Sequence, residues 1–541
     1  MIKRLFNGEI NSITTAALLV AASSLVSRFL GIFRDRILAG QFGAGDTLDI
    51  YYAAFRIPDL VYNLLILGAL SAGFIPIFTG LIKNKKGGSG ENKEAWQLTN
   101  DVLNISIVSL IFLCALGIIL APFFVKLITP GFNNEKLVLT ASLTKIMFLS
   151  PIFLGISAVF SGVLQSFKRF FVYSLSPIFY NIGIIIGALF FVPLWGIYGL
   201  AWGVVLGAFA HFIVQLPTAT SLGFRYCFRF NFYSKKIREI GMMMAPRTMS
   251  LAISQINLVV ITIIASTLNS GSLSIFNFAN NLQSFPIGIF GISFAVAAFP
   301  ALSSTAFDKK KLIKNISLAI RQILFFITPA TVLLITLRAQ IIRVVLGTGQ
   351  FGWQDTILTI NTLGFFSLSL FAQSLIPLLI RVFYARHDSK TPFIIGLVVA
   401  IINVWLSLLL SNQMGVAGLA LAFSIANILN LIILWMVLHW KIGSLDELKI
   451  LFSTIKFSSA TIVCGVVVQG IKLVIWPYID MTKFWGVFIQ GATAGLIGFF
   501  VYLAICSILQ SEELFDFWAL IKRRLSLSKI ETSDQSEARG I

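Results

Sequence analysis

The sequence predicts an all-α polytopic membrane protein with about 14 transmembrane helices, arranged as two six-helix lobes in parallel repeat plus two C-terminal helices. Composition is the first observation behind this prediction. Of the 541 residues, 57% are hydrophobic and only 12% are charged, and the mean hydropathy is +0.90. Soluble domains carry about 25% charged residues. This chain has too little charge to cover a soluble surface.

Long apolar runs are the second observation, and they recur along the whole chain. Runs such as 102–125 and 312–337 can cross a hydrocarbon core about 30 Å thick as helices. Transmembrane strands would instead alternate in polarity over about 10 residues. We therefore expect helical spans near residues 11–38, 47–82, 98–127, 138–166, 172–192, 197–218, 239–267, 272–304, 315–337, 356–384, 391–411, 416–439, 451–473 and 484–509.

The distribution of charge between the spans is the third observation. The net charge is +19, and Lys and Arg gather in loops that follow even-numbered spans, such as 225–238 and 309–314. Loops after odd-numbered spans, such as 193–196, are nearly uncharged, with 338–355 as the exception. The positive-inside rule then places both termini in the cytoplasm. The basic charge is then explained as charge of the cytoplasmic loops beside the bilayer, so we expect no nucleic-acid partner.

Residues that could hold a metal or form a disulfide are scattered. The four cysteines (Cys114, Cys227, Cys464 and Cys506) form no CxxC pair and have no histidine partner. No Gly-rich phosphate loop or nucleophile constellation is present either. We expect no metal, no cofactor and no enzymatic activity.

An internal repeat divides the chain. The segment Gly196–Ala201 recurs as Gly415–Ala420, and Ser71–Pro76 at the end of the second span parallels Ala295–Pro300 at the end of the eighth. Six spans per copy give the copies the same orientation, a transporter architecture with a substrate site between the halves. We predict lobes at 1–222 and 223–445, two further helices within 446–510, and a disordered cytoplasmic tail at 511–541.

Charged residues inside spans are costly, so they mark candidate functional sites. The first span carries Arg28, Arg34 and Asp35, with Gly31 between the arginines as a position where the helix could bend. Six positions separate the two arginines, which places them about 120° apart on a continuous helix. They share a broad face of the first span rather than a narrow stripe.

Further charges lie in or near the second and seventh spans. Asp49, Arg56 and Asp59 accompany the second, which Pro58 should kink, and Arg247 lies in the seventh. Arginine binds phosphate through a planar fork of donors, so Arg28 and Arg247 favour a cavity for a phosphate- or diphosphate-bearing ligand.

Structural explanations for these charges stay open beside the functional one. Arg34 could pair with Asp35 or Asp49, and Arg36, Arg56 and Arg381 suit the membrane interface or a structural pair. The three aspartates are more typical of ion-pair partners or ion-coupling sites than of a hydrolytic pair.

Several motifs, in order along the chain, resemble those of the MurJ/MviN family. They are Ser27–Asp35, Phe42–Gly45, Asp49–Pro58, Gly68–Pro76, Ser284–Gly291, Gln350–Phe351 and Phe383–Pro392. The resemblance implies the fold of the MOP exporter superfamily, which is MATE-like. It also implies transport of lipid II, a polyprenyl-diphosphate-linked disaccharide peptide, from the inner to the outer leaflet. The helices of 446–510 would form the groove for its lipid tail.

The resemblance also assigns site residues. Arg28, Arg34 and Asp49 stand where the family has functional charges, whereas Asn280 and Asn281 replace an Asp-Arg pair that is frequent in the eighth span. Tyr62 and Leu67 likewise stand at frequently charged positions of the second span, and Arg247 would replace a missing cavity cation. With Asp35, Gly31 and Pro58, Pro286 completes the expected structural and gating residues.

The predicted function is therefore a monomeric lipid II flippase of the bacterial cytoplasmic membrane that works by alternating access, coupled to Na⁺ or to the membrane potential. One alternative is a flippase for another polyprenyl-linked glycan. A second is a cation-coupled drug exporter of the same fold, which would need an acidic cavity. A third is a membrane scaffold without transport activity, which the short tail disfavours.

Overall fold

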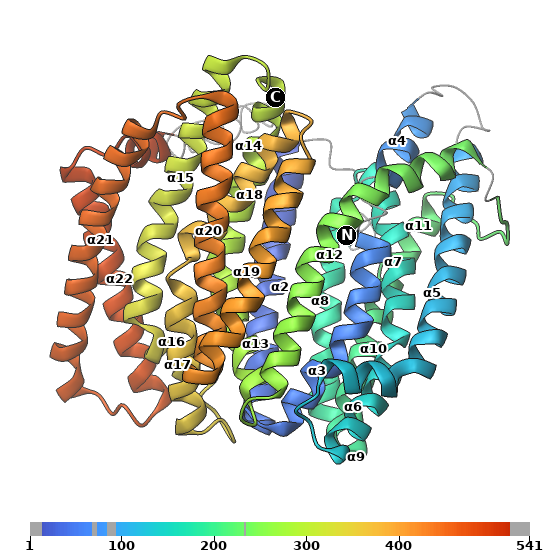
Figure 1. The fold of residues 1–541 in the computed structure, drawn as a ribbon, viewed down its shortest axis with the longest axis horizontal. Coiled ribbons are helices and arrows are strands. Elements are labelled where there is room, and N and C mark those ends of the chain that lie inside the picture. The colour runs from blue at the N-terminus through green and yellow to red at the C-terminus, as the bar shows by residue number, and fades with distance from the viewer. Residues whose placement is uncertain (1–12, 68–72, 84–92, 232–233, 520–541) are drawn as a thin grey trace, which may run out of the picture. The chain divides into compact units, whose positions relative to one another are not determined.

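The computed structural model describes residues 13–67, 73–83, 93–231 and 234–519. Within these ranges the chain is helical and forms no β-strand (Figure 1). The predicted all-α class is confirmed.

The first of two compact units comprises the chain up to Leu282 together with Val345–Thr362 and Gly396–Phe423. Its helices are long because the apolar runs contain few helix-breaking residues. A continuous helix satisfies the backbone hydrogen-bonding groups internally, as lipid requires. The helices of this unit are α2 (Ile13–Phe42), α3 (Asp46–Tyr62), η1 (Asn63–Leu67), α4 (Ile75–Lys83), α5 (Lys93–Ile128), α6 (Asn134–Met147), α7 (Leu149–Ser166), α8 (Phe170–Ile186), η3 (Gly187–Phe191), α9 (Val192–Trp195), α10 (Tyr198–Ile213), α11 (Leu216–Ser221) and α12 (Lys235–Ser266).

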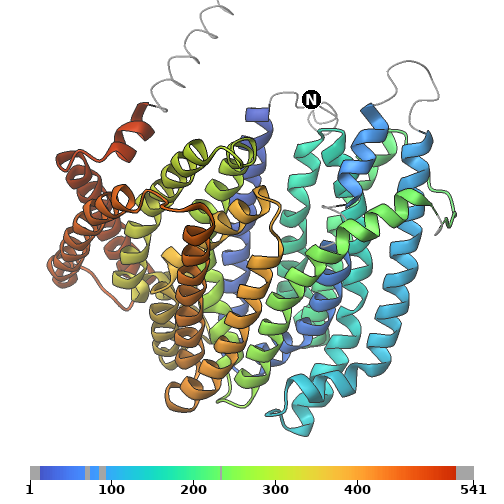
Figure 2. The ribbon, with the colours of Figure 1, turned by 45° about the horizontal axis from the view of Figure 1, so that its top comes forward.

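Glycines bring two helices of this unit into close contact. A Cβ atom on Gly183 of α8 would lie 2.3 Å from the Cα of Gly207 on α10, and one on Gly187 would lie 2.4 Å from the Cα of Gly203. These pairs are spaced four residues apart, the small-xxx-small pattern that lets backbones approach in membranes. Helix α8 also packs against α2, and α3 packs against α6 (Figure 2).

The second unit comprises Gln283–Val344, Leu363–Ile395 and the chain from Ser424. Within it α21 packs against both α15 and α22, and α14 packs against α18. Its elements are η4 (Ile287–Ile292), α14 (Ser293–Ser304), α15 (Lys309–Thr336), α18 (Leu370–Ala385), α21 (Glu447–Ile475), η5 (Trp476–Tyr478) and α22 (Phe484–Ile508). Helices that contribute residues to both units are α13 (Ser272–Pro286), α16 (Arg338–Val345), α17 (Trp353–Ser367), α19 (Lys390–Met414) and α20 (Val416–Ile442).

The multi-pass character is confirmed, whereas the count of 14 spans is not. Among the described residues, 10 helices are long and apolar enough to cross a membrane, or 11 when the bent pair α17–α18 counts as one. The first predicted span coincides with α2, which carries four charged residues within Arg28–Arg36. The seventh coincides with α12, whose apolar part is only Leu251–Ser266.

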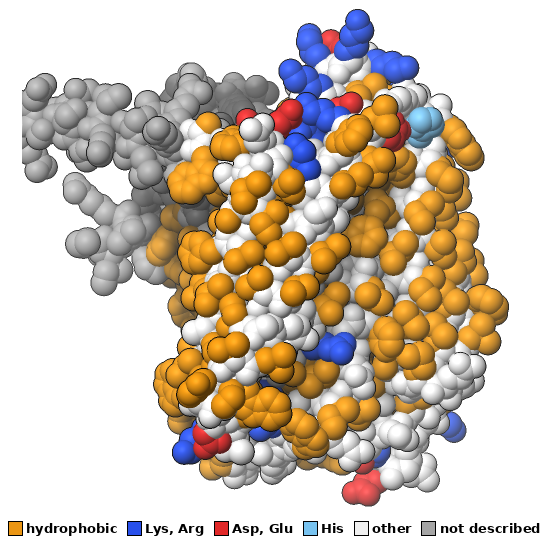
Figure 3. Space-filling view, turned by 90° about the vertical axis from the view of Figure 1, so that its left-hand side faces the viewer, with side chains coloured by type: hydrophobic (Ala, Val, Ile, Leu, Met, Phe, Trp, Pro, Cys, Tyr) orange, Lys and Arg blue, Asp and Glu red, His pale blue; other side chains and the backbone are white. Residues whose placement is uncertain are grey.

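Figure 3 shows a face covered by hydrophobic side chains, with Lys and Arg gathered at its upper edge.

The repeated Gly-x-x-Gly motif folds the same way in both places. Gly196 and Gly415 have positive φ angles of 58° and 60°, and each carbonyl accepts from the N–H of the glycine three residues later. Those later glycines, Gly199 and Gly418, pack so closely on preceding backbone that a Cβ would lie 2.4 Å and 2.2 Å from it. The motif therefore encodes a tight left-handed turn between two spans, because only glycine tolerates both requirements.

Two of the predicted bending sites, Pro58 and Pro286, each lie close to a π-helical segment. Pro58 lies inside α3 and is followed by the π-helical η1, whereas Pro286 ends α13 directly before the π-helical η4. Aligning Pro76 with Pro300 shifts the numbering by 224 (300 − 76), which places η1 on residues 287–291, inside η4. A π-turn marks irregular, often functional helix geometry, and the repeat conserves its position.

The predicted disorder of the tail from residue 511 is wrong for its first residues. Residues 512–519 form a helical segment, and Ser511 and Glu513 are buried. Arg321 of α15 binds the Glu513 carboxylate, and Ser453 of α21 donates to it at 2.9 Å. The polar composition suggested disorder, but a buried ion pair holds the segment. Residues 520–541 lie outside the described residues.

Candidate functional site

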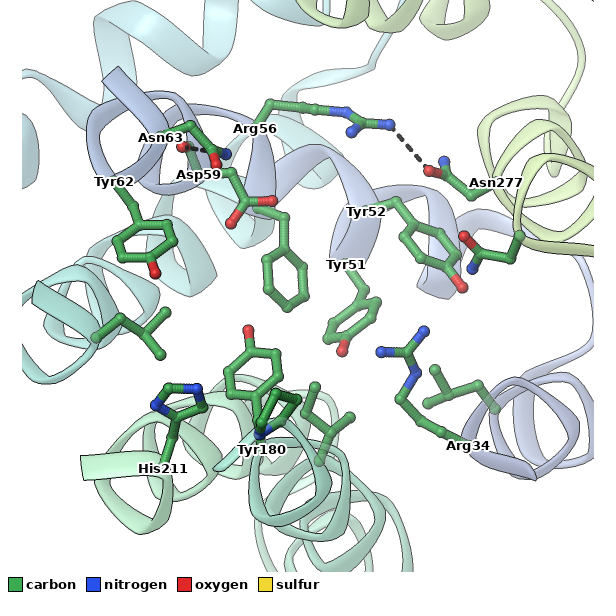
Figure 4. Close-up of a pocket in the computed structure, with 16 residues that line it drawn as sticks. Arg34, Tyr51, Tyr52, Arg56, Asp59, Tyr62, Asn63, Tyr180, His211 and Asn277 are labelled. Carbon is green, nitrogen blue, oxygen red and sulfur yellow. Dashed lines mark hydrogen bonds between the residues drawn. The ribbon is translucent and has the colours of Figure 1, made fainter. Parts of the chain in front are cut away.

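A cavity of about 410 Å³ lies within the first unit (Figure 4). Helices α2, α3, α7, α8, α10 and α13 supply its wall together with η1, and all of these elements except α7 contribute polar groups. The lining residues are Arg34, Leu38, Tyr51, Tyr52, Phe55, Arg56, Asp59, Tyr62, Asn63, Leu154, Pro177, Tyr180, Ile184, His211, Asn277 and Asn281.

Arg34 enters the cavity as part of a polar chain. Its Nε and Nη2 atoms donate to Oδ1 of Asp35 at 3.0 and 2.8 Å, and Nη1 donates to Asn181 at 3.2 Å. The second carboxylate oxygen of Asp35 accepts from Asn281 of α13 at 2.8 Å. Asp35 is buried, so the pair lowers the cost of placing a charged guanidinium in the span. Asp35 thus positions Arg34, as its predicted structural role required.

Arg56 is the second guanidinium of the cavity. Its Nε atom donates to Thr262 of α12 at 2.8 Å, and Nη2 donates to Asn277 of α13 at 2.9 Å. Neither partner carries a charge, so these contacts fix the side chain without neutralising it. The sequence analysis favoured an interfacial or structural role for Arg56, whereas the structure places it in the cavity wall.

Asp59 lies one helical turn after Arg56 on the same face of α3. Its side chain points into the open space, as do Tyr51, Tyr62 and Tyr180 (Figure 4). Within the described part of the chain, no side chain forms an ion pair or a hydrogen bond with its carboxylate. The cavity therefore contains one acidic group that the protein itself does not compensate through a direct contact.

A buried network supports the wall around His211. The hydroxyl of Ser157 on α7 lies 2.6 Å from His211 Nδ1, and it accepts from Gln215 Nε2 at 2.8 Å. Gln215 also donates to Ser176 of α8 and accepts from Ser161. These bonds join three helices and satisfy each polar group in a low-dielectric interior. They give the ring of His211 a fixed orientation toward the cavity.

Of the six predicted substrate-binding residues, the structure brings Arg34 and Asn281 to the cavity. Arg28, Asp49 and Asn280 are not among its lining residues. Asp49 is buried and accepts from the backbone N–H groups of Gly271 and Ser274, at the start of α13. Arg247 belongs to α12, but its side chain lies outside the described residues.

Sequence reasoning missed the tyrosines, His211 and Asn277. A signal for the α3 residues existed, since Tyr52, Arg56, Asp59 and Tyr62 follow helical spacing and therefore share one face. Asn277 lies four residues before Asn281 and shares its face in the same way. Tyr180 and His211 carried no such pattern, because tertiary packing alone brings α8 and α10 to the site.

Chemically, the cavity can bind but has no reactive constellation among the described residues. It offers two guanidinium donors for an anion, phenol rings and amides for uncharged polar groups, and one carboxylate for a cation. No cluster of three metal-ligating side chains occurs in the described ranges. The geometry is that of a recognition site for a large polar ligand.

Comparison with known proteins places the chain in one family. The family model described as lipid II flippase MurJ matches residues 38–489. The probable lipid II flippase MurJ of Vibrio cholerae is 30% identical over 509 residues, covering 91% of this chain and 95% of that protein. The protein of the same description from Thermotoga maritima is 30% identical over 499 residues, covering 90% and 95%.

Solved structures agree on the fold. A structure of lipid II flippase MurJ in an inward closed conformation aligns with a TM-score of 0.75 and 26% identity, covering 91% of this chain and 98% of that one. An inward-facing MATE family multidrug transporter of the MOP superfamily aligns with a TM-score of 0.67 at 14% identity, covering 80% and 99%, which supports the shared fold alone. The MOP/MATE-like fold expected from the sequence is confirmed, and the chain belongs to the MurJ family.

Proposed function

We propose that this chain is a transporter that moves lipid II, or a closely related polyprenyl-diphosphate-linked precursor, from the inner to the outer leaflet of the bacterial cytoplasmic membrane. The observation that carries the proposal is the polar cavity of the first unit, in a chain whose family model covers residues 38–489. Arg34 and Arg56 would bind the diphosphate, since guanidinium groups form paired hydrogen bonds with phosphate oxygens.

The proposed mechanism is alternating access between the two repeats, with the head group in the cavity and the prenyl chain in lipid beside α21 and α22. The protein acts as a monomer with cytoplasmic termini, and it catalyses no chemical conversion. A membrane potential that is negative inside favours outward movement of an anion by about 2.3 kcal/mol per charge and 100 mV. The potential is therefore the proposed driving force, with Na⁺ as the alternative coupling ion.

Reconstitution tests the proposal. Labelled lipid II is placed in proteoliposomes, and its appearance in the opposite leaflet is measured with and without an imposed potential. We expect wild-type protein to transfer the label and Arg34→Gln to lose at least about 90% of the rate, because one charge-assisted contact corresponds to about 1.5–3 kcal/mol. Arg381→Gln is the matched control, since Arg381 donates to the carbonyl of Pro377 in its own helix, α18. Equal loss in both variants would contradict a cavity role for Arg34.

A second candidate function is transport of a different polyprenyl-linked glycan. Tyr62 lines the cavity at a position where the family frequently has arginine, so the wall is more aromatic and less cationic than the resemblance implies. Aromatic rings suit sugar faces, which would allow another glycan to bind. Growth of cells depleted of their lipid II flippase separates the two, because only a lipid II transporter restores it.

A further inference from the structure

The acidic end of the cavity is not explained by binding of a diphosphate. A phosphate-binding site gains nothing from a carboxylate, because the two anions repel each other. Asp59 nevertheless lines the cavity of the first unit beside Arg56 on the same helix. A positively charged group of the ligand at this end would compensate the carboxylate.

The groups around Asp59 have the composition of a cation site. The phenol groups of Tyr51, Tyr62 and Tyr180 line the same cavity as its carboxylate. All four side chains are directed toward the same space in Figure 4. No hydrogen bond among the described residues occupies the hydroxyl groups of these tyrosines, so their oxygens can accept from a ligand. A carboxylate with nearby phenol oxygens and aromatic rings matches the requirements of an ammonium group.

The cationic groups of the same cavity cannot take that place. Arg34 is paired with Asp35, and Arg56 donates to Thr262 and Asn277 rather than to Asp59 (Figure 4). Both guanidinium groups are therefore held by other partners. The carboxylate of Asp59 therefore shares the cavity with both guanidinium groups without forming a direct ion pair with either.

We propose that Asp59, with Tyr51, Tyr62 and Tyr180, forms a subsite that binds a primary ammonium group on the peptide of the transported precursor. This inference rests on the proposed function, because it assigns one part of the same ligand. The diphosphate contacts Arg34 and Arg56 while the ammonium group contacts the carboxylate of Asp59. Two contacts of opposite sign fix the orientation of the head group and favour precursors that carry the amine.

The test compares two synthetic precursors in the same proteoliposomes. Both carry the polyprenyl diphosphate and disaccharide, and the peptide of each contains one lysine, whose side-chain amine is free in one and acetylated in the other. We expect wild-type protein to transfer the free amine about tenfold faster, the effect of one charge-assisted hydrogen bond. Asp59→Asn, which keeps the size of the side chain, should transfer both forms at the slower rate.

The control variant is Asp480→Asn, because Asp480 lies in the exposed turn before α22 and pairs with Lys483 there. It should keep the tenfold preference. Wild-type protein that transfers both precursors equally fast would overturn the subsite and leave the flippase function intact, even where Asp59→Asn does not fold. Wild-type protein that transfers neither precursor would instead reject the proposed function. A bound Na⁺ ion is the other possible source of positive charge at Asp59, and replacing Na⁺ with K⁺ tests it. Transfer that depends on Na⁺ in the wild type but not in Asp59→Asn, and that shows no preference for the free amine, also overturns the ammonium assignment.

Discussion

Oδ1 of Asp49 on α3 accepts from both the backbone N–H and the hydroxyl of Ser274, at 2.8 and 2.6 Å. Its other oxygen accepts from the N–H of Gly271 at 2.8 Å. The first N–H groups of a helix have no partner within that helix, and negative charge is favourable there. Asp49 therefore caps α13 from a neighbouring helix and fixes the N-terminus of the helix that carries Asn277 and Asn281 into the cavity.

Replacing Asp49 should lower the stability of the protein more than it affects binding of the ligand. Asp49→Ala leaves two buried N–H groups unsatisfied, and we expect a loss of about 2 kcal/mol in the free energy of unfolding. Asp49→Asn keeps one acceptor and should lose less. Thermal unfolding of the purified protein in detergent measures both.

Asp46→Ala is the matched control, because Asp46 lies at the start of the same helix but is half exposed, where it pairs with Lys136. Exposed ion pairs contribute about 0–1 kcal/mol. A cap role for Asp49 is untenable when the two alanine variants unfold at the same temperature.

The pair Arg34–Asp35 gives a second prediction. Asp35→Asn removes the charge opposite a guanidinium that is only 21% exposed, so we expect a loss of about 2 kcal/mol. The double variant Arg34→Gln/Asp35→Asn removes both charges and should regain most of that stability, yet it should not transport lipid II. Recovery of transport in the double variant would show that Arg34 is structural, as one interpretation of the sequence allowed.

The fold could be predicted from the sequence far better than the site. Span positions follow from apolar runs such as Lys93–Ile128, because lipid permits few alternatives to a continuous helix. The repeat was visible in Gly196 and Gly415, whose left-handed conformation requires glycine in both copies. The first span was harder to assign by hydropathy, since Arg28, Arg34 and Arg36 make α2 polar, and Arg34 among them lines the cavity.

The site depends on which helix faces meet, and periodicity within one helix does not reveal that. The sequence favoured Arg28 for the cavity and left a structural pairing open for Arg34, but of these two only Arg34 lines the cavity. Asp49 resembled a ligand-binding charge in the sequence. Its partners include backbone N–H groups of Gly271 and Ser274, and no pattern of side chains indicates such partners. His211 looked isolated because Ser157 is 54 positions away in the chain.

Close packing of α8 and the following η3 on α10 yields a third prediction. A Cβ on Gly187 would lie 2.4 Å from the Cα of Gly203, so Gly187→Ala must push the two backbones apart. Overpacking of this kind costs about 1–3 kcal/mol. It should also move Tyr180 and His211, which these helices carry into the cavity. We expect a lower unfolding temperature together with weaker binding of labelled lipid II. Gly241→Ala in α12 is the control, because no atom lies within 4 Å of its added Cβ.

The last prediction concerns the buried ion cluster of the second unit. Arg321 is 6% exposed and binds both Glu513 and Glu512, while Glu513 also accepts from Ser453 and Ser511. Glu513→Ala leaves the Arg321 guanidinium buried with only the exposed Glu512 to compensate it, and removing one partner of a buried pair costs about 3–5 kcal/mol. We expect residues 512–519 to detach from α15 and α21, which limited proteolysis would detect as new cleavage after the end of α22. Glu512→Ala should leave the segment protected, since its carboxylate is exposed and pairs mainly at the surface with Lys449. Equal cleavage of the two variants would mean that the buried pair does not hold the segment, and apolar contacts such as those of the buried Leu514 would then have to hold it.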